Sequence, residues 1–133
     1  MEIETKRKDN RWIKGAFAIL AWLFFISIIV QVFLAGIALF VDFGHWNFHQ
    51  SFVHYFEFVP VVMLILAFFG GIPKNLRWHS LSLYIMIILQ YVTVNLTGKI
   101  PYIGAIHPII ALLLFWRALF MVKEGNELIN KNI

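Results

Sequence analysis

The chain has no cysteine and very little charge. None of its 133 residues offers a thiol that could form a disulfide, bind a metal as thiolate or act as a nucleophile. Only 14% of the residues are charged, whereas a soluble domain carries about 25%. That deficit leaves too little charge to cover a water-facing surface, and 61% of the residues are apolar. The composition therefore excludes an ordinary soluble domain and predicts a protein whose main solvent is lipid.

Long apolar stretches follow one another along the chain, each near the ~20 residues that cross a bilayer core as a helix. The predicted spans are residues 13–41, 49–72, 78–95 and 101–122. Short connections place successive helices antiparallel, and no stretch alternates as a strand would. We therefore predict an all-α fold class, an integral membrane four-helix up-down bundle. It forms a single domain over residues 1–133, with tails at 1–12 and 123–133.

Basic residues gather on one side of the predicted membrane. Of the eleven lysines and arginines, only Lys99 falls on the other side. Because basic loops stay in the cytoplasm, this asymmetry predicts a multi-pass protein of the cell (plasma) membrane with both termini cytoplasmic. Orientation accounts for the net charge of +4, so nucleic acid is not an expected partner. The lipid bilayer is, and the cluster Lys6, Arg7 and Lys8 is expected to contact anionic lipid.

The few polar side chains inside the spans fall at one depth. Such groups are costly in hydrocarbon, so each needs a partner or a function. At ~1.5 Å rise per residue, they occupy a layer roughly 10 Å thick on the non-cytoplasmic side. Every helix contributes to this layer, which makes it the candidate site. Its members are Gln31, His49, His54, Glu57, Gln90 and His107.

A Gln–His spacing occurs twice. Gln31 precedes His49 by 18 residues, and Gln90 precedes His107 by 17. The chain is therefore expected to contain two parallel repeats whose histidine-bearing helices run in the same direction. Two imidazoles facing each other across such a bundle grip a planar tetrapyrrole edge-on. The pattern predicts haem b as cofactor, with His107 as one metal ligand. Spacing favours His49 as the other ligand, whereas depth favours His54.

Other residues are expected to support such a site. Gln31, Gln90 and Glu57 would contact the cofactor, with Glu57 as an acceptor that fixes the tautomer of a histidine. Tyr91 would form part of an aromatic wall for a flat ligand. Pro60 should kink the second span and free the carbonyl of Phe56, because proline lacks the N–H that this carbonyl would accept.

Three segments resemble a known family. They are residues 31–40 (QVFLAGIALF), 46–49 (WNFH) and 106–114 (IHPIIALLL). They are similar to a widespread bacterial family of small four-span membrane proteins classed as a domain of unknown function. That resemblance implies the fold and the membrane location.

The layout also resembles, more distantly, one half of haem A synthase and small b-type cytochromes. In those proteins, histidines at the outer ends of the second and fourth helices ligate haem, which implies the same for His49 or His54 together with His107. Haem A synthase has a glutamate one turn before its histidine and an arginine directly after it. Here Gln50 follows His49 and Tyr55 follows His54, so the resemblance extends to haem ligation rather than to haem modification.

Three functions fit these residues. The first is haem b binding for electron transfer or haem handling, with a membrane redox partner. The second is a structural or accessory role, alone or as a homo-oligomer, in which the polar layer only locks helix packing. The third is metal, quinone or proton handling, with His54 and Glu57 as a proton pair. No activated serine with a nearby base is apparent, so a stand-alone enzyme is not expected.

Overall fold

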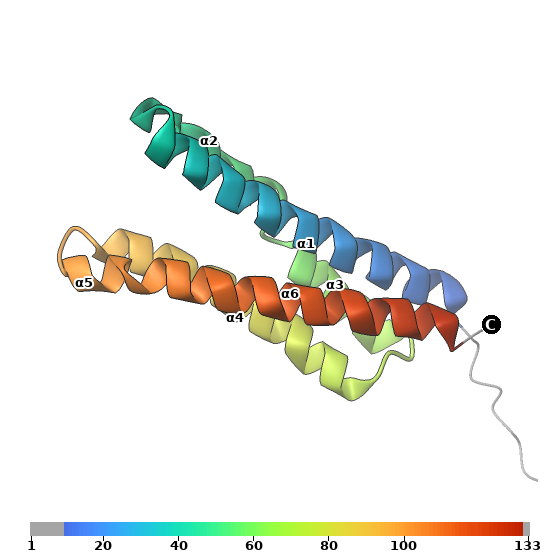
Figure 1. The fold of residues 1–133 in the computed structure, drawn as a ribbon. Helices are drawn as coiled ribbons and strands as arrows, with labels where there is room; N and C mark the ends of the chain where they lie inside the picture. The colour runs from blue at the N-terminus through green and yellow to red at the C-terminus, as the bar shows by residue number, and fades with distance from the viewer. Residues whose placement is uncertain (1–9, 132–133) are drawn as a thin grey trace, which may run out of the picture.

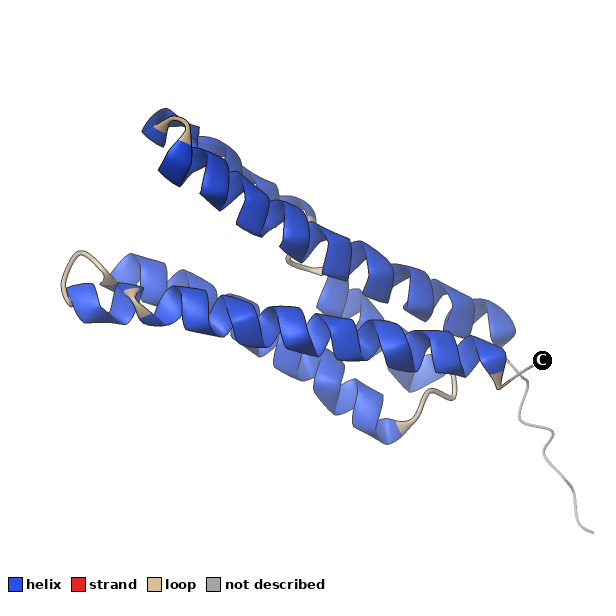
Figure 2. Cartoon of the chain, viewed as in Figure 1, coloured by secondary structure: helices blue, strands red, loops and turns tan. Residues whose placement is uncertain are grey.

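The computed structural model describes residues 10–131, and within this range every regular element is a helix (Figure 2). The elements are α1 (Arg11–Phe40), η1 (Phe43–His45), α2 (Trp46–Phe52), η2 (Val53–Tyr55), α3 (Val59–Phe69), α4 (Lys74–Leu96), α5 (Pro101–Gly104) and α6 (Ile106–Asn130). The prediction of an all-α chain is confirmed. The basic cluster Lys6, Arg7 and Lys8 lies outside the described residues.

Four helical stretches are long and apolar enough to cross a membrane. They are Arg11–Phe40, Phe43–Phe69, Lys74–Leu96 and Pro101–Asn130. A helix pairs its backbone N–H and C=O groups internally, as a segment in hydrocarbon must. Large apolar side chains point outward from these helices, with Phe33 65% and Leu112 71% exposed. A water-soluble protein would bury such a surface, so the chain is a multi-pass membrane protein.

The second span is interrupted midway. α2 ends at Phe52, the 3-10 turn η2 follows, and α3 begins at Val59 with Pro60 in its first turn. Proline suits a first turn because the N–H that it lacks would have no helical acceptor there. The predicted release of the Phe56 carbonyl is wrong, because this oxygen accepts the N–H of Val59 at 3.0 Å. The break therefore turns the chain without leaving that carbonyl unpaired.

Each spanning segment packs against two others. α1 contacts α6 and the α2–α3 segment, and α4 contacts α3 and α6. Figure 1 shows the start of α1 and the end of α6 at the same end of the molecule, which we call the terminal end. The opposite end, with η1 and α5, is the loop end. At the terminal end, the link between α3 and α4 turns through Gly71, whose φ of 65° suits glycine.

The apolar core lies toward the terminal end. Its largest fully buried side chains include Phe17, Phe24, Met63, Ile72, Leu76, Leu83 and Met121. By contrast, η1, α2, η2 and α5 contain no buried residue. Toward the loop end, α1 and α2 diverge from α4 and α6 (Figure 1). Apolar packing thus holds the helices together at the terminal end, whereas the polar side chains of the predicted layer lie toward the loop end.

Small residues let α1 and α6 approach closely. Ala18 and Gly125 are both buried, and a Cβ on Gly125 would lie 3.1 Å from the Cα of Ala18. In lipid, such close backbone contact is a main source of helix association.

We expect Gly125→Val to lower the free energy of unfolding by about 1–3 kcal/mol, because the added side chain would force α6 away from α1. The measurement is the thermal unfolding midpoint of the detergent-purified protein. Gly36→Val is the matched control, since a Cβ there meets nothing within 4 Å. Equal midpoints for the two variants would contradict the close packing of α1 and α6.

Candidate functional site

The first half of the chain contains a reciprocal pair of hydrogen bonds between α1 and α2. The side-chain Nε2 of Gln31 donates to the backbone carbonyl of His49 at 2.8 Å. In return, Nδ1 of His49 donates to the backbone carbonyl of Gln31 at 2.9 Å. Since a carbonyl only accepts, Nδ1 carries a proton, and in the neutral form of the ring the lone pair is then on Nε2. We call this arrangement the Gln–His clasp.

The second half repeats the clasp between α4 and α6. With the Gln90 amide oriented so that its oxygen accepts from the N–H of Ala111 at 3.1 Å, its nitrogen donates to the backbone carbonyl of His107 at 3.0 Å. Nδ1 of His107 lies 3.3 Å from the backbone carbonyl of Gln90 and 3.3 Å from the hydroxyl of Thr93. In the same orientation the Gln90 amide nitrogen also donates to Nδ1 of His107 at 2.8 Å, so this Nδ1 is an acceptor and a neutral ring carries its proton on Nε2. Both halves therefore pair a glutamine amide with a histidine carbonyl.

The two clasps also differ at the amide oxygen of the glutamine. The amide oxygen of Gln90 accepts from Ala111, four residues after His107. The matching residue after His49 is Val53, whose N–H bonds to the carbonyl of Ser51 where α2 ends. The amide oxygen of Gln31 is buried and has no partner among the described residues. The interruption of the second span thus removes the donor that the fourth span keeps.

The two clasped histidines lie next to each other. The ring centroids of His49 and His107 are 6.5 Å apart, with 63° between the ring planes. Both rings are half-buried. Each uses Nδ1 for its clasp, and within residues 10–131 neither Nε2 has a hydrogen-bond partner. In His49, whose Nδ1 is held by a backbone carbonyl, Nε2 is the nitrogen available to ligate a metal.

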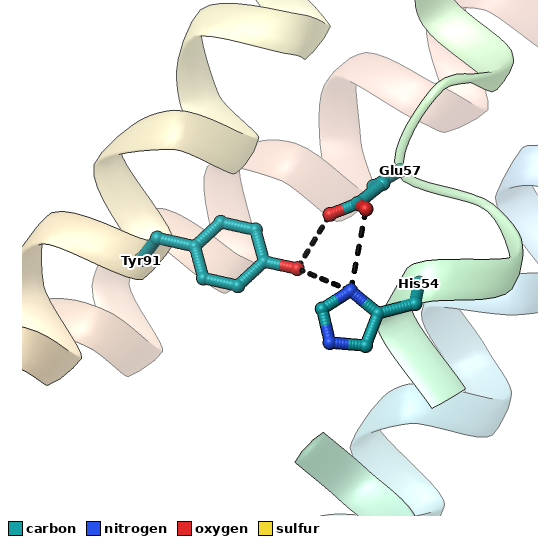
Figure 3. Close-up of polar contacts among 3 residues, drawn as sticks. All are labelled: His54, Glu57 and Tyr91. Carbon is teal, nitrogen blue, oxygen red and sulfur yellow. Dashed lines mark hydrogen bonds and ion pairs between the residues drawn. The ribbon is translucent and has the colours of Figure 1, made fainter. Parts of the chain in front are cut away.

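Glu57 forms a separate cluster with His54 and Tyr91, shown in Figure 3. The Tyr91 hydroxyl donates to Oε2 of Glu57 at 2.5 Å. Nδ1 of His54 lies 3.2 Å from Oε1 of Glu57 and 3.3 Å from the Tyr91 hydroxyl. The His54 and Tyr91 rings are stacked, with centroids 6.2 Å apart. The carboxylate therefore has a neutral donor on one side and a titratable imidazole on the other.

The predicted layer thus separates into two groups. Gln31, His49, Gln90 and His107 form the clasps, whereas His54 and Glu57 contact each other and Tyr91. His54 makes no ring contact with His107 in the described chain. The choice of His49 or His54 as ligand stays a prediction, as do the cofactor roles of Gln31, Gln90 and Glu57. Among residues 10–131, no group of three or more His, Cys, Asp or Glu side chains could hold a metal ion.

Two contributors were missed from the sequence or given another role. Tyr91, expected only as an aromatic wall, is the closest donor to Glu57. Thr93, only 6% exposed, contacts His107 and donates to the backbone carbonyl of Gln90 at 2.9 Å. The available signal was its position three residues after Gln90, which places both on one face of α4.

The chain belongs to a known family. The sequence profile of DUF6220, a family of unknown function, matches residues 31–98. The matched range contains Gln31, His49, Glu57 and Gln90, and it ends before His107. The predicted resemblance to a family of unknown function is confirmed, and the likeness to haem A synthase and b-type cytochromes stays a prediction. Comparisons with curated proteins and with solved structures give no match.

Removing the Tyr91 hydroxyl should weaken the Glu57 cluster. We expect Tyr91→Phe to lower the free energy of unfolding by about 1–2 kcal/mol, because the half-buried carboxylate loses its shortest hydrogen bond. The measurement is a double-mutant cycle with Glu57→Gln in detergent, read as unfolding midpoints. The effects should be non-additive. Additive effects would mean that the two side chains do not interact.

The clasps should contribute similarly to stability in both halves. Gln31→Leu and Gln90→Leu are each expected to cost about 0.6–2 kcal/mol, the range of interhelical hydrogen bonds in membranes. Unfolding midpoints of the single variants test this. Ser27→Ala is the control, because Ser27 bonds only to the carbonyl of Leu23 on its own helix. A glutamine variant no less stable than this control would refute a contribution from its clasp.

Proposed function

We propose that this membrane protein binds haem b between α2 and α6, and that His49 and His107 would hold it. The observation that carries the proposal is the 6.5 Å separation of the imidazole centroids. At that separation both rings would be near enough to contact one group bound between them. Haem needs only two protein ligands, because the macrocycle supplies the other four.

The clasps suit ligating histidines. Nδ1 of His49 is already held by a backbone carbonyl, which orients the ring and raises the basicity of Nε2. For His107 to ligate through Nε2, its proton must lie on Nδ1. The Gln90 carbonyl or the Thr93 hydroxyl, both 3.3 Å away, would then accept it, and the Gln90 amide nitrogen, 2.8 Å from Nδ1, would have to turn away. Bound haem would supply one-electron chemistry for electron transfer, or would itself be cargo in haem handling.

The surroundings of the two rings also favour this ligand. α2 packs on α1, whereas α6 packs on α1 and α4. Near His49 and His107 the helices lie beyond the tightly buried core, so a flat group would displace few buried side chains. In the structural alternative, the same hydrogen bonds only hold the helices together, and the Nε2 atoms of His49 and His107 have no role.

A second candidate function is proton exchange at Glu57. The observation in its favour is the contact of this carboxylate with both a tyrosine hydroxyl and a histidine, with the His54 side chain 62% exposed. A carboxylate and an imidazole in contact form a short proton relay. This function would require His54 and Glu57, whereas haem binding requires His49 and His107.

We infer an up-down arrangement in the plasma membrane with both termini cytoplasmic. The distribution of basic residues supports this orientation, since ten of the eleven lie on the side of the termini and of the link between α3 and α4. The polar site would then lie in the non-cytoplasmic half of the bilayer.

Visible absorption spectra test the proposed ligands. The detergent-purified protein, supplied with haem, is expected to show a Soret band and a sharp reduced α-band after dithionite. His49→Ala and His107→Ala should each lose the bis-histidine spectrum, because one axial ligand is missing. His54→Ala is the matched control and should keep the spectrum. A protein that stays colourless after haem addition would refute the proposal and leave the clasps as helix-packing contacts.

Because the chain has no native cysteine, single cysteines report its orientation cleanly. In intact cells, Gly98→Cys is expected to react with a membrane-impermeant maleimide, since it lies in the loop-end connection beside Lys99. Asn75→Cys, exposed in the first turn of α4 at the terminal end, should react only after the membrane is opened. The reverse pattern would place the termini outside.

A further inference from the structure

A groove on the face shared by α4 and α6 contains an arginine within an apolar wall. The depression has a volume of about 460 Å³. It is lined by His79, Met86, Leu113, Trp116, Arg117 and Phe120. None of these residues belongs to the clasps or to the Glu57 cluster, so the groove is independent of the proposed haem site.

Arg117 has no carboxylate partner within residues 10–131. It is exposed, and its guanidinium donates to Nδ1 of His79. Arg77, near the same end of α4, provides a contrast. Its Nε donates to the carbonyl of Ala67 at 3.1 Å, and its guanidinium lies 4.9 Å from the centre of the Phe68 ring. A cation within a membrane span needs compensation, and of these two arginines Arg117 is the one that lines the groove.

The side chains around Arg117 present hydrogen-bond donors. Because arginine only donates, Nδ1 of His79 is an acceptor, so the neutral ring carries its proton on Nε2. The ring of Phe120, with its centroid 4.6 Å from that of His79, holds the imidazole in place. Trp116 is 70% exposed and offers an indole N–H, which also only donates. Guanidinium, imidazole and indole together form a donor set that suits an anion, and guanidinium binds phosphate especially well.

The depth of the groove points to a lipid. Arg117 lies six residues before Lys123 on α6, or about 9 Å along the helix. An arginine at that depth reaches the lipid phosphates while its stem stays in the apolar region. Glu124 acts electrostatically on His79, but it lies seven residues beyond Arg117, about 10 Å nearer the end of the helix. The apolar walls formed by Met86 and Leu113 match an acyl chain.

We propose that this groove binds an anionic phospholipid. Arg117, with His79 and Trp116, holds the phosphate, and the apolar walls hold an acyl chain. The site combines charge recognition with apolar contact, so neither a free phosphate nor a zwitterionic lipid satisfies it fully.

Native mass spectrometry of the full chain, released from detergent after mixing with phosphatidylglycerol, measures the bound lipid. The wild-type protein is expected to retain phosphatidylglycerol in preference to phosphatidylcholine. Arg117→Gln should bind it about tenfold more weakly, the loss expected for one charge-assisted hydrogen bond. Lys123→Gln is the matched control, since it removes the same charge outside the groove and should bind as the wild type does. Leu113→Trp fills the groove without altering charge and should also reduce binding.

Several results would overturn the proposal. Equal phosphatidylglycerol binding by Arg117→Gln and Lys123→Gln would show that Arg117 does not recognise the headgroup. Equal retention of phosphatidylcholine by the wild type would reduce the groove to an apolar surface. Inorganic phosphate that displaces the lipid completely would identify a free anion as the occupant. If Arg117→Gln does not fold, undiminished binding by Leu113→Trp still refutes the site.

Discussion

Hydrocarbon offers no hydrogen bonds, so a polar group that enters it is costly unless the protein supplies a partner. In this chain that constraint acts most visibly on two glutamines and two histidines. The amide of each glutamine bonds to a histidine carbonyl. The His49 ring donates back to the Gln31 carbonyl, and the His107 ring accepts from the Gln90 amide nitrogen. The clasps tie α1 to α2 and α4 to α6 with the same groups. Apolar residues in place of the two glutamines would remove the side-chain hydrogen bonds that help to orient the histidines.

The two ends of the molecule are held together by different kinds of contact, because the clasps lie toward the loop end. Close apolar packing, with Ala18 against Gly125, holds the terminal end. The loop end has no comparable core, and polar contacts take over there. This division leaves the two imidazoles beside each other in a less tightly buried region. It also separates them from the arginine groove, which lies nearer the terminal end on the outer surface.

The sequence predicted the four spans and the all-α class because the apolar runs are long and the polar residues few. The Gln–His spacing picked out the four residues that form the clasps, although it predicted a repeat rather than these hydrogen bonds. It could not separate His54 from His49, because assigning the faces of a helix at about 100° per residue requires an unbroken helix. Here η2 interrupts the second span between His49 and Glu57. The contact of His79 with Arg117 could not be predicted from the sequence either, because the two residues lie 38 positions apart in different spans.

Gln90 and Tyr91 are consecutive residues on α4, yet they serve different neighbours. Gln90 bonds to His107 on α6, and Tyr91 bonds to Glu57 just before α3. Successive side chains on a helix point about 100° apart. α4 therefore contributes one side chain to the second clasp and the next to the Glu57 cluster. A rotation of α4 about its axis would displace both side chains together, so the contact with α6 and the contact with Glu57 share one rigid support.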